Sequence, residues 1–205
     1  IGLPRTLKAT FDLSAPGRQG LALAAAHPIE WLQAWKPMLQ AWKNPENAAR
    51  INKQIEEMLQ PITDAYNART GKKVKSLLKL YETGPDAVSG DRVPGFESMG
   101  RGKIAEVVSK TPGISNSERA YSTFLNYQKA KTLVNMAKAH GGKANPETIF
   151  RIAQNIDHAT GMGAQPFKGD LAGQVLFSQR YTTSRFQFLA DPFIEAIRNR
   201  DLVAA

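Results

Sequence analysis

The sequence contains no cysteine and only three histidines among its 205 residues. Without cysteine, the chain can form neither a disulfide framework nor a thiolate metal site. A structural zinc site would have to combine His27, His140 and His158 with an unusual set of carboxylate ligands. We therefore expect the chain to hold no metal ion and no cofactor.

Long apolar runs are also missing. The longest, from Leu21 to Ala26, is far shorter than the roughly 20 residues that a membrane-spanning helix needs. No basic-then-apolar signal segment opens the chain. We expect no membrane span. Because the sequence begins at Ile1 rather than at Met, we interpret the chain as a processed product, an internal fragment or the ordered part of a longer protein.

The composition favours a folded, basic protein. Hydrophobic residues make up 42% of the sequence, which is enough for a core, and 27 Lys and Arg face 18 Asp and Glu, a net charge of +9. No stretch alternates apolar and polar residues as a half-buried strand does, whereas apolar residues recur at helical spacing along the chain. The sequence predicts an all-α fold, an irregular bundle of about seven to nine helices with proline kinks.

A stretch rich in Gly and Pro separates two helical parts. It is too long for an ordinary connection between helices. We expect an N-terminal helical subdomain over residues 1–82, a linker or ordered loop over 83–102, and a C-terminal helical subdomain over 103–205; one continuous domain is the alternative. The expected helices cover residues 3–9, 16–27, 29–42, 46–69, 72–81, 103–110, 117–140 and 146–161, followed by an aromatic helical tail over 176–197.

Prolines and tryptophans give these helices individual features. Pro37 should kink helix 29–42, and Pro61 should bend helix 46–69 without ending it. On helix 29–42, Trp31, Trp35 and Trp42 fall within about 60° of one another. Such a face suits packing in the core or between subunits, a membrane interface, or stacking on bases. We favour packing; membrane contact is possible but not favoured, because Lys36 and Lys43 flank the face as ordinary solvated residues.

One run of basic residues is a candidate contact for phosphate. Between Asp64 and Glu82 the charged residues are all basic: Arg69, Lys72, Lys73, Lys75 and Lys79. With no aromatic residues suited to stacking, this run predicts weak, non-specific and salt-sensitive nucleic-acid binding. An ordinary solvated helix face explains it equally well.

Motifs for catalysis are incomplete. The glycines Gly95 and Gly100 have the spacing of a phosphate-binding loop, but Arg101 and Gly102 follow where Lys and Ser or Thr are required. Similarly, Gly161-Met-Gly163 lacks the third glycine of a dinucleotide fingerprint. Glu97 could act as the acid of a muramidase-like site, with an exposed loop carboxylate as the plainer explanation. We therefore assign no catalytic residue and expect no enzyme activity.

Four segments together carry a resemblance to a known family. They are residues 7–20 (LKATFDLSAPGRQG), His27-Pro28 before the tryptophans, residues 117–126 (SERAYSTFLN) and residues 176–186 (LFSQRYTTSRF). In this order they resemble the helical large polyvalent-protein-associated domains of tailed-bacteriophage internal virion and ejection proteins. Residues 46–69 and 82–102 do not contribute. The resemblance transfers no catalytic residue.

The resemblance implies a location and partners. Such proteins are carried in the phage particle, its interior or its tail and portal region, and are delivered with the genome into the host cell. Partners would be other virion proteins and further copies of the chain, with possible DNA contact. We therefore expect a non-enzymatic structural or assembly module for genome delivery. A stand-alone nucleic-acid-binding module and a peptidoglycan hydrolase-associated domain are the alternatives. The residues expected at interfaces or in packing are Trp31, Trp35, Trp42, Arg180, Arg185 and Phe186.

Overall fold

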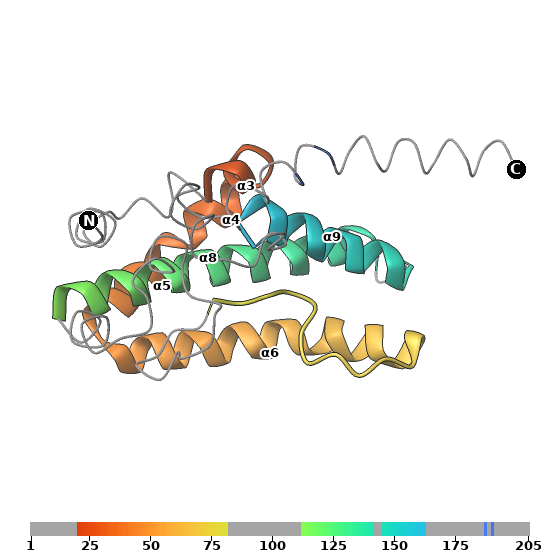
Figure 1. The fold of residues 1–205 in the computed structure, drawn as a ribbon, viewed down its shortest axis with the longest axis horizontal. Helices are drawn as coiled ribbons and strands as arrows, with labels where there is room; N and C mark the ends of the chain where they lie inside the picture. The colour runs from red at the N-terminus through yellow and green to blue at the C-terminus, as the bar shows by residue number, and fades with distance from the viewer. Residues whose placement is uncertain (1–19, 82–111, 142–144, 163–186, 188–189, 191–205) are drawn as a thin grey trace, which may run out of the picture.

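The computed structural model describes residues 20–81, 112–141, 145–162, 187 and 190. This part of the chain is mostly helical and contains no strand, as the sequence predicts (Figure 1). Its helices are α3 (Gly20–Ala26), α4 (Pro28–Gln33), α5 (Trp35–Lys43), α6 (Pro45–Thr70), α8 (Pro112–Ala139) and α9 (Pro146–Ala159). The helices expected over 3–9 and 103–110, the connection over 83–102 and the tail over 176–197 lie almost wholly outside the described residues.

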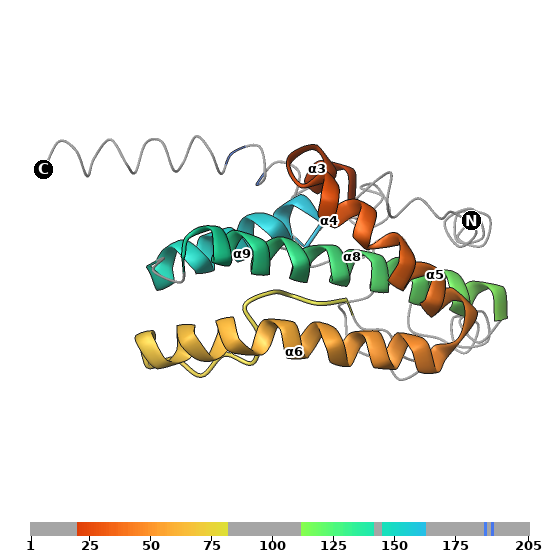
Figure 2. The ribbon, with the colours of Figure 1, turned by 180° about the vertical axis from the view of Figure 1, so that it is seen from behind.

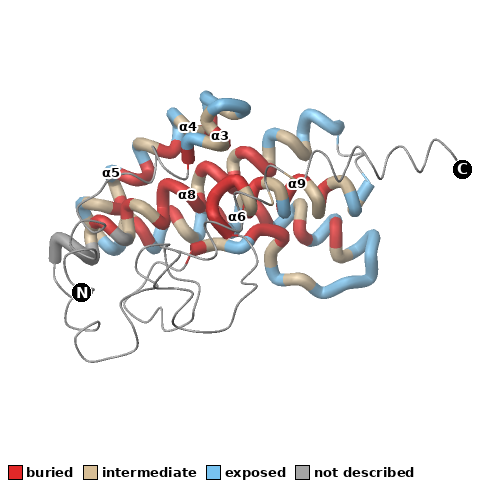
Figure 3. The backbone as a smooth tube through the Cα atoms, turned by 45° about the horizontal axis from the view of Figure 1, so that its top comes forward, coloured by how far each residue is buried: buried red, intermediate tan, exposed pale blue. Residues whose placement is uncertain are grey.

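Helix α8 is central to the described part. Helices α4, α5, α6 and α9 all contact it (Figures 1 and 2). Buried residues occur on all sides of its middle section, including Phe124, Leu125 and Leu133, which are fully buried (Figure 3). The sequence predicts a helix here over residues 117–140. The helix begins earlier, however, because Pro112 fits the first turn, where the proline's missing N–H is not needed.

Two helices begin with the same tripeptide, Asn-Pro-Glu. The Asn44 side chain accepts a hydrogen bond from the Glu46 backbone N–H at 2.7 Å, and the Asn145 side chain accepts one from Glu147 at 3.1 Å. In each case asparagine caps the helix and proline occupies its first position. At the other end of α6, Gly71 adopts φ 69°, a left-handed conformation that glycine reaches without strain.

Pro37 interrupts the helix expected over 29–42, as predicted. Helices α4 and α5 are separated at Ala34, three residues earlier. Pro37 has no N–H to donate to the carbonyl of Gln33, and its ring crowds that carbonyl. The interruption therefore falls one turn before the proline. Pro61, in contrast, lies within α6, which continues through it as expected.

The short basic helix expected over 72–81 is also wrong. These residues form no helix; they run back between α6 and α8 (Figures 1 and 2). Their backbone is paired with side chains instead of with its own carbonyls. The Asn67 side chain donates to the Val74 carbonyl at 2.9 Å and accepts from its N–H at 3.0 Å, and Asn126 pairs in the same way with Tyr81, both at 2.8 Å. Tertiary hydrogen bonds have overridden the helical propensity.

Two hydrophobic clusters form the core. The larger joins α6, α8 and α9 through residues such as Ile55, Leu133 and Ile156. The smaller joins α5 and α8 around Met38 and Phe124. Residues from 20–81 and from 112–162 contribute to both clusters. The division of the chain at 83–102 stays a prediction.

Candidate interaction surfaces

The three tryptophans lie on the inner side of α4 and α5. Trp31 and Trp35 meet edge to face at 5.3 Å between ring centroids, and both meet Phe124 of α8, at 6.3 and 5.9 Å. Trp42 packs against the same cluster. Edge-to-face geometry is the arrangement that aromatic quadrupoles prefer. These rings therefore hold α4 and α5 against α8.

A neighbouring face of the same helices is apolar and open to solvent. Among the described residues, the exposed large hydrophobic side chains are Leu21 (57%), Ile29 (62%), Leu32 (62%) and Leu39 (52%), all on α3, α4 or α5. Along α4 and α5, three of them alternate with two exposed lysines within about 80° of helical rotation. We call this set the Leu-Lys stripe: Ile29, Leu32, Lys36, Leu39 and Lys43.

No exposed acidic side chain lies beside the stripe on residues 20–43. Glu30 is the single acidic residue between positions 20 and 43, and it is buried, where its carboxylate accepts a hydrogen bond from the Asn135 side chain at 2.7 Å. The exposed face of α3 to α5 is therefore apolar and cationic. Exposed apolar residues gathered on one face, rather than scattered singly, indicate a contact surface.

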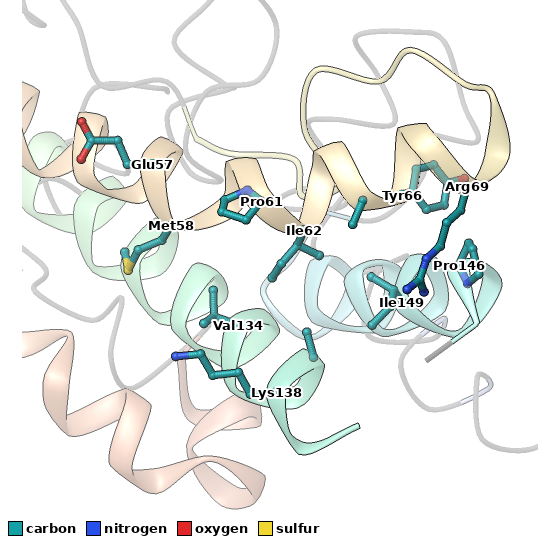
Figure 4. Close-up of a pocket in the computed structure, with 12 residues that line it drawn as sticks. Glu57, Met58, Pro61, Ile62, Tyr66, Arg69, Val134, Lys138, Pro146 and Ile149 are labelled. Atoms are coloured by element: carbon teal, nitrogen blue, oxygen red, sulfur yellow. The ribbon is translucent and has the colours of Figure 1, made fainter. Parts of the chain in front are cut away.

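A groove of about 510 Å³ opens between α6, α8 and the start of α9 (Figure 4). Its walls are mainly apolar: Met58 and Ile62 from α6, Val134 from α8 and Ile149 from α9. Charged residues border it, with Glu57 and Arg69 toward opposite ends of its α6 wall and Lys138 on α8. Concave apolar surfaces with few charges at their edges are typical of binding sites.

A third unusual feature is a buried ion pair between α8 and α9. Lys129 Nζ lies 2.7 Å from Asp157 Oδ1, and the two side chains are 0% and 6% exposed. Lys129 also donates to the Lys79 carbonyl, and the Lys79 N–H donates to Asp157 Oδ2 at 3.1 Å. Burial lowers the pKa of Lys129, opposed by the attraction of Asp157. Lys129 does not line the groove.

The ion pair belongs to a larger polar junction. The Tyr81 hydroxyl donates to the Thr160 carbonyl at 2.7 Å, and the Lys129 ammonium lies 5.4 Å from the Tyr81 ring centroid. Together with the Asn126 hydrogen bonds, these contacts fix the end of segment 71–81 to α8 and α9. The buried charges have protein partners and no opening toward solvent at Lys129. Their arrangement positions backbone rather than a substrate.

The structure brings some predicted site residues together and separates others. Lys72, Lys73, Lys75 and Lys79 are exposed along segment 71–81, and Arg69 lies at the groove. They follow an extended backbone and do not share a helix face. Lys72 Nζ lies 3.4 Å from the Tyr66 hydroxyl. Arg180, Arg185, Phe186, Glu97 and the glycines of the phosphate-loop match lie outside the described residues.

The histidines are far from forming a common site in the described fold. His27 precedes α4, His158 is in the last turn of α9, and His140 follows α8, with its Nδ1 3.1 Å from the Met136 carbonyl oxygen. No three His, Cys, Asp or Glu side chains of the described part are grouped as metal ligands. No helix of that part is long and apolar enough to cross a bilayer.

Sequence reasoning missed the Leu-Lys stripe and the Lys129–Asp157 pair. The stripe gave only a weak signal, because helical spacing places Leu32 and Leu39 within about 100° of the tryptophans, at the edge of the same face. Lys129 gave a weaker signal: it is a charged residue in a helix with no consistently polar face. Its partner Asp157 lies on another helix, so periodicity alone does not identify the pair.

The comparisons with known proteins add no family. No protein-family model matches the chain, and no curated protein or solved structure matches it either.

Proposed function

We propose that this chain is a non-enzymatic assembly module of a bacteriophage particle, which binds other virion proteins and copies of itself. The Leu-Lys stripe carries the proposal. Three large apolar side chains, each more than half exposed, lie along one helical face with two lysines and no exposed acid. Such a face lowers its free energy by burying apolar area against a partner.

The phage context rests on the resemblance of the four sequence segments. In this proposal the complete chain is an irregular bundle of about seven to nine helices, carried in the virion and delivered with the genome. The inward placement of the tryptophans supports assembly through the outer face of α4 and α5. The rings hold α4 and α5 against α8 and leave the stripe exposed.

The test compares a stripe variant with a matched control. Leu32→Ser with Leu39→Ser removes apolar contact area without altering charge. The control, Ala49→Ser with Gln54→Ser, changes two exposed positions of α6 outside the groove. Sedimentation velocity should show self-association of the wild type and the control but not of the stripe variant. Mass spectrometry of phage particles should show the variant depleted. Equal association and equal packaging of both variants would refute the proposal.

A second candidate is non-specific DNA binding through segment 71–81. Its support is the exposure of Lys72, Lys73 and Lys75 on a backbone anchored at both ends by side-chain hydrogen bonds. Fluorescence anisotropy on duplex DNA should then fall steeply with salt, and reversing these three lysines to Glu should abolish binding. Unchanged DNA binding by that variant would exclude this segment.

A further inference from the structure

We infer that α8 and α9 form a binding slot for an extended peptide, and that residues 77–81 occupy this slot as an intramolecular ligand. The slot consists of the side chains of Asn126 and Lys129 on α8, the side chain of Asp157 on α9, and the backbone carbonyl of Thr160. A partner peptide of the same pattern binds there by displacing residues 77–81. This inference is independent of the Leu-Lys stripe and goes beyond the proposed function.

The slot pairs with the main chain of the segment at two alternate residues. The Lys79 N–H donates to Asp157 at 3.1 Å, and Lys129 donates to the Lys79 carbonyl. Asn126 pairs with both the N–H and the carbonyl of Tyr81, each at 2.8 Å. Alternate residues of an extended chain present N–H and C=O to the same edge, which is how a sheet recognises an added strand. Here side chains of two helices take the place of the neighbouring strand.

Side-chain specificity comes from a tyrosine and two leucines. Tyr81 is 2% exposed, lies in the smaller hydrophobic cluster and donates its hydroxyl to the Thr160 carbonyl at 2.7 Å. Leu77 and Leu78 are buried in the larger cluster. Lys79, in contrast, is exposed. The slot therefore selects an extended peptide with a pair of apolar residues three and four positions before a tyrosine.

The two walls of the slot are joined to each other directly, without the segment between them. Lys129 Nζ of α8 lies 2.7 Å from Asp157 Oδ1 of α9. Leu133 of α8 and Ile156 of α9 belong to the same core cluster. Residues 77–81 form no helix, and a segment without its own hydrogen-bond ladder opens locally before helices do. The walls of the slot therefore stay together when residues 77–81 leave.

Attachment within the chain gives residues 77–81 an advantage over a free peptide. An intramolecular ligand acts at an effective concentration on the order of millimolar. A free peptide binds only the fraction of molecules whose slot is open, and its apparent affinity falls by that fraction. Weakening the intramolecular occupant should therefore raise the affinity for a free peptide.

The test uses the full chain and a fluorescein-labelled peptide with the sequence of residues 75–82, KSLLKLYE. Lys79→Pro with Tyr81→Ala, which we call the released variant, removes the N–H that Asp157 accepts and the buried ring. Fluorescence anisotropy should show at least about tenfold tighter peptide binding by this variant than by the wild type. The matched control, Lys73→Ala with Lys75→Ala, changes two exposed residues of segment 71–81 and should behave as the wild type.

Two further changes locate the bound peptide. Adding Asn126→Ala to the released variant should abolish peptide binding, because the slot loses both of its hydrogen bonds to the tyrosine main chain. A peptide carrying Tyr81→Phe loses the hydrogen bond to the buried Thr160 carbonyl and should bind about tenfold more weakly.

The outcomes separate the slot from binding elsewhere. Equal binding of a scrambled peptide, or binding that survives Asn126→Ala, places the peptide elsewhere and overturns the slot. Absence of binding by a folded released variant does the same. If the released variant does not fold alone, the peptide should restore its helical circular dichroism signal, and failure to restore it also overturns the inference.

Discussion

The polar junction and the Leu-Lys stripe reverse the usual distribution of side chains. At the junction, Lys129 is fully buried, whereas on the stripe Leu32 is 62% exposed. Lysine is among the residues least often buried, and it is tolerated inside only when paired. Every group at the junction has a partner within the chain, while Leu32 and Leu39 of the stripe are more than half exposed. The junction therefore serves the fold, whereas in the proposed function the stripe serves contacts with partners.

The two regions also differ in the process to which their side chains contribute free energy, folding or association. A buried ion pair loses hydration on both sides, so its net contribution to stability is small even though breaking it is costly. Its value lies in specificity: only one path of segment 71–81 places the Lys79 backbone between Lys129 and Asp157. An exposed leucine, in contrast, contributes little to folding and gains energy only on association.

The largest expected effect follows removal of the carboxylate at the junction. Asp157→Ala leaves Lys129 buried without a counterion and leaves the Lys79 N–H without an acceptor. We expect the free energy of unfolding to fall by about 3–5 kcal/mol, measured by urea denaturation.

The matched control replaces both charges. Lys129→Met with Asp157→Leu removes the cost of an unpaired charge and fills the space with apolar atoms, so stability should return to near the wild-type value. A single variant as stable as the double variant would show that the ion pair is not closed to solvent.

A smaller loss is expected at Asn126. Its side-chain amide satisfies both the N–H and the carbonyl of Tyr81, and all of these groups are buried. Asn126→Ala leaves two buried backbone groups unpaired, for a loss of about 2–3 kcal/mol. Hydrogen exchange should then show earlier opening of residues 77–81 than of α6. Uniform loss of protection across all helices would contradict a role confined to this segment.

Much of the helical framework was predictable, because local signals set it. The Asn-Pro-Glu starts of α6 and α9 and the glycines that follow α6 and α8 predicted their ends to within a few residues. Segment 71–81 was not predictable, because its partners Asn126 and Asp157 are 45 or more positions away in sequence. The interruption of helix 29–42 was predicted from Pro37, but the residue at which it falls, Ala34, was not, because the effect of a proline falls on the preceding turn.

The candidate surfaces were predictable only in part. The tryptophan face of α4 and α5 was found from its spacing, since bulky rings dominate the pattern. The neighbouring leucines, Leu32 and Leu39, were overlooked, because helical spacing alone does not distinguish a buried leucine from an exposed one. The groove depends on how α6, α8 and α9 pack against one another. That tertiary arrangement has no local signature.

The pH dependence of the free energy of unfolding tests whether burying the charge of Lys129 destabilises the folded state. Burial lowers its pKa in the folded state, whereas in the unfolded chain it holds its proton up to the ordinary lysine value, about 10.4. Between these two pKa values the unfolded state binds more protons, so the free energy of unfolding rises with pH, by at most about 1.4 kcal/mol per unit. Below the folded value the contribution is constant.

The measurement is the difference between wild type and Lys129→Met in urea midpoints up to about pH 9, below the range in which tyrosines of ordinary pKa ionise. Subtracting the variant cancels the contributions of the lysines that lie away from the junction. A difference that falls with pH across this range would mean that Asp157 holds the folded pKa of Lys129 above the unfolded one.

The smallest effect on the free energy of unfolding is expected at the stripe. A small effect there, beside a large one at the junction, would show that the two regions have different roles. Leu32→Ser with Leu39→Ser replaces side chains that are already 62% and 52% exposed, so the free energy of unfolding of the monomer should change by about 0.5 kcal/mol or less. It should be measured at concentrations too low for association, since self-association stabilises the folded chain more as its concentration rises. At high concentration the wild type should then gain a higher unfolding midpoint and the variant should not. A variant as destabilised as Asn126→Ala at low concentration would place these leucines among residues that hold the fold, and the stripe would lose its standing as a surface for partners.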